Sequence, residues 1–215
     1  MLKMEKKWIY PDLTNGVKIK ELATLFDLSE TIMKVLFNRG LTDNSEIEKF
    51  LNLDYTSFCD PFLLKDIEIA VERIINAISK NEIITIYGDY DVDGITSTSL
   101  MVKVLTDLGG NVNYYIPERQ SEGYGLNSEA LENICGSGTS LVITVDCGIS
   151  AVEEVNQFKN KLGIIITDHH QPPEILPDAL AIINPKQIDC VYPEKNLAGV
   201  GVAFKLCQAL WYKIK

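Results

Sequence analysis

The residues best suited to chemistry in this chain are carboxylates and histidines gathered in three short clusters. Aspartates occupy alternate positions within IYGDYDVDGITS (residues 86–97), and both histidines of the chain stand side by side after a further aspartate. Carboxylates that lie so close together raise one another's pKa and cost stability unless cations neutralise them. Oxygen-rich sites that include imidazole suit Mn²⁺ or Mg²⁺. The candidate residues are Asp89, Asp91 and Asp93; Asp146; and Asp168, His169 and His170.

The segments around these clusters alternate between short apolar runs and helix-like stretches. Near-continuous apolar strands that alternate with helices indicate a parallel sheet covered on both faces. We therefore expect an α/β fold with an open, mainly parallel five-stranded sheet and helices on both faces, preceded by a small N-terminal helical segment. The expected strands are 83–87, 112–116, 141–145, 163–167 and 179–183, and the expected helices between them are 95–110, 127–136 and 149–161.

Three of the expected strands lead directly into the three clusters. Ligands of open α/β sheets bind outside the carboxyl ends of the strands, so the clusters should meet at one edge of the sheet. Two divalent cations about 3.5 to 4 Å apart would activate a water and stabilise the leaving oxygen of a phosphate ester. The pattern thus favours metal-dependent phosphoryl or phosphodiester hydrolysis.

Other interpretations of the same residues carry less weight. D-Y-D-V-D-G begins like a calcium-binding EF-hand loop, but the twelfth position is Leu100 instead of glutamate, and a strand precedes the motif. Solvated turn aspartates would explain the first cluster alone, yet they do not explain Asp146 and His169. Cys147 has no general-base partner in the sequence, so a small buried residue is favoured over a nucleophile.

The N-terminal part of the chain has a helical pattern. Three short helices are expected within residues 17–53, with Ser29 as an N-cap and Gly40 as a stop signal. A longer amphipathic helix follows, with apolar residues on one face between Ile67 and Ile78. We expect residues 1–80 to form a helical segment with a linking helix, and residues 81–215 to form the α/β domain.

Composition limits the possible partners and location. The formal net charge is −10, which opposes nucleic-acid binding by bulk electrostatics, so a polyanion would need metal ions or a local cationic patch. The five cysteines form no C-x-x-C pair, which argues against a disulfide framework and a thiolate zinc site. The N-terminus lacks the pattern of a signal peptide, and no run approaches a membrane span. A cytoplasmic protein is expected.

Taken in order, GDYDVDG, VDCG and DHH resemble the motifs of the DHH phosphoesterase superfamily. The flanking sequences are similar to the bacterial single-strand-specific 5′-to-3′ DNA exonucleases of that superfamily. This resemblance extends over nearly the whole chain. The flanking matches are FNRGL (37–41), CDPFLLKDIEIAVERIINAI (59–78), IPERQSEGYGLN (116–127) and INPKQIDCVYPEKNLAGVGVAFKL (183–206).

The resemblance implies a role for each cluster residue. Asp91 would serve one ion and Asp93 the other. Asp146 would bridge the two ions, and His169 would ligate the ion shared with Asp93. His170 would either face substrate phosphate or have a structural role.

Two positions depart from the ligand pattern of the superfamily. Where many members have a histidine four residues before the first ligand, this chain has Tyr87, a poor ligand when neutral. Asp89 is the candidate to fill that place. Asp168 is expected to orient the histidines instead of binding metal.

The resemblance also implies an activity and partners. The cofactors would be two Mn²⁺ or Mg²⁺ ions, and the substrate would be single-stranded DNA, degraded during DNA repair and recombination. Single-stranded-DNA-binding protein and a helicase are candidate partners, and no membrane is involved. The superfamily carries a fourth aspartate and a C-terminal domain beyond the stretch matched here. We therefore expect a truncated N-terminal piece that binds metal less tightly and has little exonuclease activity by itself.

Two loops are candidates for substrate binding. Arg119 and Tyr124 could present a guanidinium and an aromatic platform to single-stranded DNA, although a solvated flexible loop is an equal alternative. Gly199 and Gly201 open an expected helix whose N–H groups could receive a phosphate. Close packing by glycine at a helix start explains the second pair at least as well.

Three other functions remain open from the sequence. Other DHH phosphoesterases hydrolyse cyclic dinucleotides, short oligonucleotides or pyrophosphate with similar motifs. A catalytically silent scaffold module is a second alternative, which the retained ligands oppose. A flavodoxin-like Mg²⁺-dependent regulatory domain is a third, and it would not need the two histidines.

Overall fold

The computed structural model describes residues 16–52, 54, 58–123 and 125–214. The chain divides into two compact units, Met1–Phe58 and Cys59–Lys215. Within its described residues, the first unit contains three short helices around a small core that includes Met33, Phe37 and Ile47. These helices are α1 (Gly16–Leu25), α2 (Glu30–Asn38) and α3 (Asn44–Leu51).

The ends of the first-unit helices follow their sequence signals. The side chain of Ser29 accepts a hydrogen bond from the N–H of Ile32, 3.3 Å away, and so caps α2 as expected. Gly40 follows α2 with a φ of 87°, a left-handed conformation that favours glycine. Asp43 caps α3 by accepting from the N–H groups of Ser45 and Glu46.

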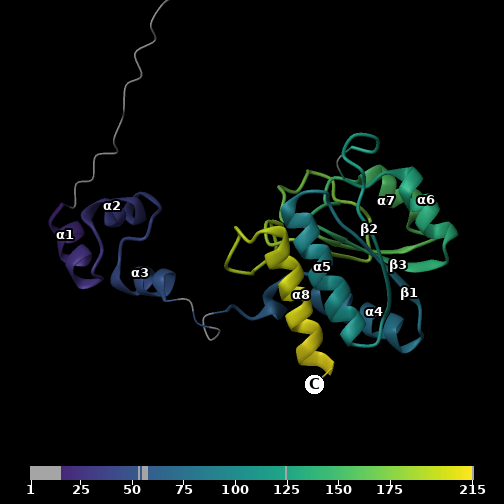
Figure 1. Ribbon diagram of the computed structural model, residues 1–215, viewed down its shortest axis with the longest axis horizontal. Helices are drawn as coiled ribbons and strands as arrows, with labels where there is room; N and C mark the ends of the chain where they lie inside the picture. Colours follow the sequence, from purple (N-terminus) through teal and green to yellow (C-terminus); the bar gives the residue numbers. More distant parts are fainter. Residues whose placement is uncertain (1–15, 53, 55–57, 124, 215) are drawn as a thin grey trace, which may run out of the picture. The chain divides into compact units, whose positions relative to one another are not determined.

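The second unit is built on a five-stranded sheet in which every neighbouring pair is parallel, with the order β2-β1-β3-β4-β5 (Figure 1). This confirms the α/β fold class and all five expected strands. The strands are β1 (Ile83–Tyr87), β2 (Asn111–Tyr115), β3 (Thr139–Val145), β4 (Gly163–Thr167) and β5 (Ala181–Ile183).

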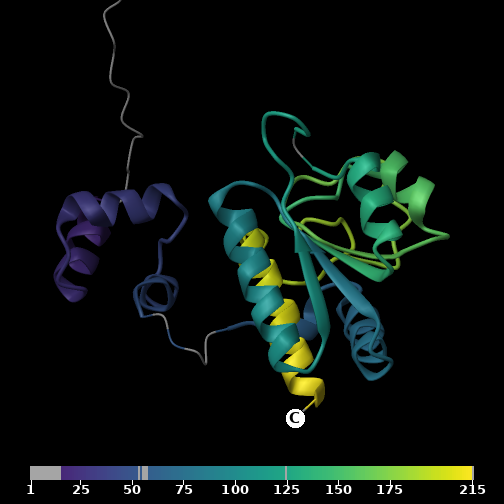
Figure 2. The ribbon, with the colours of Figure 1, turned by 45° about the vertical axis from the view of Figure 1, so that its right-hand side comes forward.

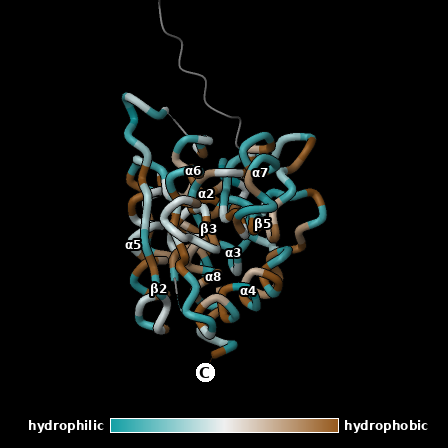
Figure 3. The backbone as a smooth tube through the Cα atoms, turned by 90° about the vertical axis from the view of Figure 1, so that its right-hand side faces the viewer, coloured by the Kyte–Doolittle hydropathy of each residue, from teal (hydrophilic) through white to brown (hydrophobic). Residues whose placement is uncertain are grey.

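Helices cover both faces of the sheet because four of its strands, all except the edge strand β2, are largely buried on both sides. One core joins the strands to η2 (Pro61–Leu63), α4 (Ile67–Ser79), α5 (Val92–Asp107) and α8 (Gly199–Ile214). The other core joins them to α6 (Ser128–Gly136) and α7 (Val152–Phe158). Figure 2 shows α8 running alongside α5, and Figure 3 shows hydrophobic stretches recurring along α4 and α8.

The compact units of the structure divide at a different residue from the expected boundary. We placed the helix that begins at Ile67 in the N-terminal segment, but α4 packs on α8 and β5 within the second unit. Its Ala70, Val71 and Ile74 are fully buried in the sheet core, and Oδ2 of Asp66 accepts a hydrogen bond from the β5 N–H of Ile182 at 3.1 Å. The apolar face of this helix is buried against the sheet, as in a helix of the α/β unit. The two compact units therefore divide between residues 58 and 59.

Within the described residues, no helix combines the length and the apolar character that a membrane crossing requires.

Candidate metal centre

The three polar clusters lie at one edge of the sheet, as the sequence predicted. In the parallel ladder, Tyr87 at the end of β1 pairs with Thr144 of β3, and Val145 pairs with Thr167 of β4. The carboxyl ends of the three strands are therefore level. The residues that follow each strand must emerge side by side at that edge.

The first cluster is held by the start of α5. Asp91 is the N-cap, and its Oδ1 accepts from the N–H groups of Asp93 and Gly94 at 2.8 and 3.0 Å. Gly94 lies directly against the backbone of Asp89, where a Cβ atom would overlap it. This close approach turns the loop after β1 so that all three aspartates gather at the helix start.

Asp89 is a buried carboxylate with an unsatisfied oxygen. Only 3% of the residue is exposed, and within the described part of the chain Oδ1 has no hydrogen-bond partner. Burial raises the pKa of this carboxyl. A buried acceptor without a partner is costly, and a cation at this position would supply the missing interaction.

Asp146 occupies the centre of the site. It adopts a left-handed conformation with a φ of 61°, and its N–H donates to the carbonyl of Thr167 at 3.0 Å. The residue is 2% exposed. Burial, followed by the negative charges of Asp93 and Asp91, raises the pKa of Asp146 to about 7. The fold therefore confines negative charge that bound cations would stabilise.

His169 turns one ring nitrogen toward these carboxylates. Its Nδ1 lies 3.0 Å from the carbonyl oxygen of Leu197. Because a carbonyl only accepts, Nδ1 carries the proton and Nε2 has the lone pair in the neutral ring. Nε2 lies 3.1 Å from Oδ1 of Asp146 and 3.7 Å from Oδ2 of Asp93. These short distances would allow all three side chains to bind the same ion.

Asp168 orients the histidine pair. Its Oδ1 accepts from the N–H groups of His169 and His170 and lies 2.7 Å from Nδ1 of His170, while Oδ2 accepts from the N–H of Ile149. Burial acts to raise the pKa of Asp168, but the hydrogen bonds from His170 outweigh it and lower the pKa. The hydrogen bond to Asp168 in turn raises the pKa of His170. The ionised Asp168 carboxylate is thus fully engaged by the protein.

The described residues contain two groups of side chains that could each hold a metal ion. Within each group, the potential ligand atoms lie within 4.8 Å of one another. Asp146 belongs to both groups, as a residue that bridges two ions would. The donors are carboxylate oxygens and imidazole nitrogens, which fit Mn²⁺ or Mg²⁺. The groups are Asp89, Asp91 and Asp146, and Asp146, His169 and His170.

The sequence left two roles open for the start of α8, phosphate binding and close packing. The N–H groups of Gly199 and Val200 each donate to Asp93 at 2.7 Å. The helix dipole and free N–H groups favour any anion, and here a side chain of the site takes that place. A Cβ on Gly199 would lie 2.5 Å from Oδ1 of Asp146, whereas Gly201 faces the side chain of Leu197. Both glycines therefore serve close packing.

The remaining sequence candidates lie around this edge or outside the description. The guanidinium of Arg119 lies 5.3 Å from the ring centroid of Tyr90, beside the first cluster. Tyr124 lies outside the described residues. Tyr87 is fully buried, and its hydroxyl donates to the carbonyl of Gly125 at 3.0 Å. Cys147 is also fully buried, and burial raises the pKa of its thiol, which opposes a role as a nucleophile.

Several residues that shape the site were not predicted. They are the carbonyl of Leu197, the N–H groups of Ile149 and Val200, the ring of Tyr90 and the carboxylate of Glu122. Most act through backbone groups, which have no residue-type signature. For Leu197, Gly199 and Val200 the only signal was the glycine-containing LAGVG segment that we singled out for another reason.

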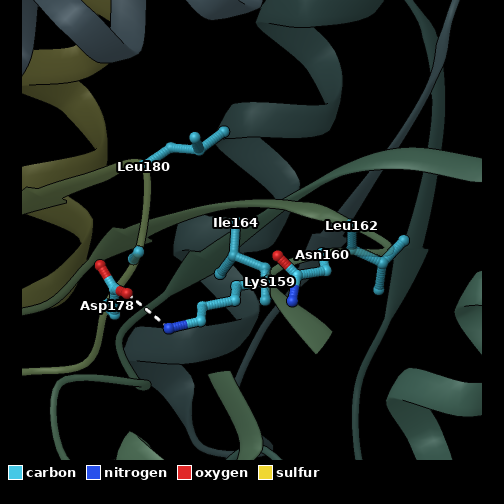
Figure 4. Close-up of a pocket in the computed structure, with 7 residues that line it drawn as sticks. Lys159, Asn160, Leu162, Ile164, Asp178 and Leu180 are labelled. Atoms are coloured by element: carbon cyan, nitrogen blue, oxygen red, sulfur yellow. Dashed lines mark hydrogen bonds and ion pairs between the residues drawn. The ribbon is translucent and has the colours of Figure 1, made fainter. Parts of the chain in front are cut away.

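A cavity of about 420 Å³ lies elsewhere, beside the start of β4 (Figure 4). Leu162 and Ile164 line it, and Lys159 forms an ion pair with Asp178 at 2.6 Å across it. The metal-ligand candidates follow the opposite end of β4, so this cavity is not part of the site.

Comparisons with known proteins agree with this geometry. The family described as DHH family, N-terminal domain, matches residues 83–215. The single-stranded-DNA-specific exonuclease RecJ of Bacillus subtilis is 48% identical over 90% of this chain, and that of Escherichia coli is 40% identical over 86%. These alignments cover 25% and 32% of the two relatives, so the chain spans about a quarter to a third of their length.

Two solved structures are also similar to the chain. Exonuclease RecJ bound to manganese matches 70% of this chain and 38% of that chain, with a TM-score of 0.65 and 36% identity. RecJ from Thermus thermophilus in complex with Mn²⁺ matches 92% and 27%, with a TM-score of 0.68 and 28% identity. The family match covers more than half of the sequence and includes all three clusters. The chain therefore belongs to the DHH family.

Proposed function

We propose that this chain carries the metal centre of a Mn²⁺- or Mg²⁺-dependent exonuclease that hydrolyses single-stranded DNA from 5′ to 3′. The observation that carries the proposal is the position of Asp146, shared by two groups of potential ligands at the carboxyl edge of the sheet. The RecJ relatives, two of them solved with manganese, supply the substrate class and the metal. DNA repair and recombination in the cytoplasm are the proposed setting, with single-stranded-DNA-binding protein and a helicase as proposed partners.

Each residue of the centre has a role in this proposal. Asp89, Asp91, Asp93, Asp146 and His169 are the metal ligands. When bound, two such ions activate a water and stabilise the leaving oxygen of a phosphodiester. The hydrogen bond between Nδ1 of His169 and the carbonyl of Leu197 orients Nε2 toward the carboxylates of Asp93 and Asp146.

Asp93 and His170 have further roles in the centre. The N–H groups of Gly199 and Val200 fix the Asp93 carboxylate against α8. His170 is the more exposed histidine, and Asp168 holds its ring at the rim, where it can contact a substrate phosphate.

The test is Mn²⁺-dependent degradation of 5′-phosphorylated single-stranded DNA by two proteins. One is the 215-residue chain, and the other, termed the extended chain, is the same sequence joined to the remaining C-terminal portion of the Bacillus subtilis relative. We expect hydrolysis by the extended chain and weak or no hydrolysis by the 215 residues alone. Replacing Asp146 with alanine should abolish hydrolysis, and the exposed Asp107→Asn control should not.

Two outcomes would contradict the proposal. Hydrolysis of cyclic dinucleotides or pyrophosphate without degradation of DNA would indicate another DHH phosphoesterase. Unchanged Mn²⁺ binding after His169→Ala would contradict the ligand set and favour a regulatory domain that binds metal through carboxylates alone.

A further inference from the structure

The described residues of the loop between β2 and α6, 116–123 and 125–127, are organised around the carboxylate of Glu122. Oε2 of Glu122 accepts a hydrogen bond from the N–H of Glu118 at 2.8 Å. Oε1 accepts from the hydroxyl of Tyr115 and from Nδ2 of Asn127, the latter at 3.2 Å. The N–H of Glu122 also donates to the carbonyl of Glu118 at 2.9 Å. One side chain thus ties together the two ends and the interior of the loop.

This network connects the loop to rigid elements. Asn127 caps α6 by accepting from the N–H of Ala130 at 2.7 Å, and its Nδ2 lies 3.3 Å from the hydroxyl of Tyr87 at the end of β1. That hydroxyl donates to the carbonyl of Gly125. The hydrogen bonds from Glu118 and Tyr115 lower the pKa of Glu122. An ionised acceptor forms stronger hydrogen bonds than a neutral one.

The loop carries Arg119 to the edge of the metal centre. Its guanidinium lies 5.3 Å from the ring centroid of Tyr90, which stands between Asp89 and Asp91 in the chain. A guanidinium there can make a bidentate contact with a phosphate.

We propose that Glu122 is a positioning residue that fixes residues 116–123 so that Arg119, stacked on Tyr90, meets a phosphate of the substrate strand. This inference rests on the proposed function and adds to it the device that places the phosphate. A loop already fixed by hydrogen bonds avoids most of the ordering cost of binding. The solvated flexible loop that the sequence left open does not explain a carboxylate with three hydrogen-bond donors.

The kinetic test compares Glu122→Gln, Arg119→Ala and the double variant in the extended chain, on 5′-phosphorylated single-stranded DNA. Glutamine keeps the shape of the side chain but removes its charge and replaces one carboxylate oxygen with an NH₂ group, which donates hydrogen bonds. We expect KM to rise about 10-fold in each single variant with kcat changed less than about 2-fold, because a phosphate contact made before and during the reaction is lost. The double variant should resemble Arg119→Ala, since both changes remove the same contact. Glu118→Gln is the matched control, because its carboxylate accepts from Ser121 in the same loop.

A second measurement does not depend on catalysis. Hydrogen exchange of residues 116–123 in the 215-residue chain should be faster in Glu122→Gln than in the wild type, and unchanged in Glu118→Gln. The inference would be overturned if the amides of Glu122→Gln exchanged at the wild-type rate, or if the increases in KM were additive in the double variant. Either result would count even when the wild-type extended chain hydrolyses DNA normally. Failure of the wild-type extended chain to degrade DNA would instead overturn the proposed function, so the two failures are distinguishable.

Discussion

The sharpest prediction concerns Asp146→Asn in the metal-free protein. Asp146 is almost completely buried, and its environment raises its pKa from 3.8 to about 7. At about 1.4 kcal/mol per pKa unit, this shift corresponds to about 4 kcal/mol of folding free energy lost when the carboxyl ionises. Asparagine has nearly the same shape without the charge, and it tolerates the left-handed backbone at this position. The variant should therefore be more stable than the wild type in the absence of metal.

The sign of the pH dependence follows from the direction of the shift. The folded protein binds this proton more tightly than the unfolded chain, so stability contributed by Asp146 is lost as the pH rises from 3.8 to about 7. The gain from Asp146→Asn should reach about 4 kcal/mol at pH 8 and about half of that at pH 5. In a unit of this size, 4 kcal/mol corresponds to a rise in Tm of about 10 °C.

The assay is urea unfolding in EDTA at pH 5 and pH 8, followed by circular dichroism and repeated with saturating Mn²⁺. The wild type should gain stability from Mn²⁺, whereas Asp146→Asn should gain little, because the shared ligand is lost. Asp107→Asn is the control, since that carboxylate is exposed and pairs with Lys103 on the surface. A loss of stability in metal-free Asp146→Asn at pH 8 would refute the idea that the fold confines charge for cations to neutralise.

Further substitutions test the packing around the centre. Gly199→Ala should weaken Mn²⁺ binding at least about 10-fold by calorimetry, because the added Cβ would displace the Asp146 carboxylate, while Gly201→Ala should bind normally; equal affinities would contradict this packing. Cys147→Ala should cost about 1 kcal/mol in urea unfolding and leave hydrolysis by the extended chain intact, and an inactive variant would argue against the two-metal proposal. Tyr87→Phe should lose about 1 to 2 kcal/mol with its hydroxyl hydrogen bonds but keep its Mn²⁺ affinity, and a change in affinity would place Tyr87 among the ligands.

The sheet and the position of the candidate metal centre could be predicted because they depend on local patterns. Parallel strands buried on both faces appear as apolar runs, and the structure confirms strands at 83–87 and 163–167 with the expected bounds. Because ligands of open α/β sheets bind outside the carboxyl ends of the strands, the sequence also predicted that Asp89, Asp146 and His169 would meet at one edge. The cap of α2 at Ser29 was also local, since a side chain bonded to an N–H three residues ahead determines it.

The tertiary structure decided the features that join residues distant in the sequence. Asp93 is held by N–H groups more than 100 residues later, a contact that no pattern in the sequence indicated. Because α4 packs on β5 and α8, the compact units divide after residue 58, whereas the sequence suggested a division after residue 80. An amphipathic helix does not reveal which apolar surface it covers. Types and spacing of residues thus determined which side chains could form the centre. Long-range backbone hydrogen bonds, which any residue type can make, decided how those side chains are oriented.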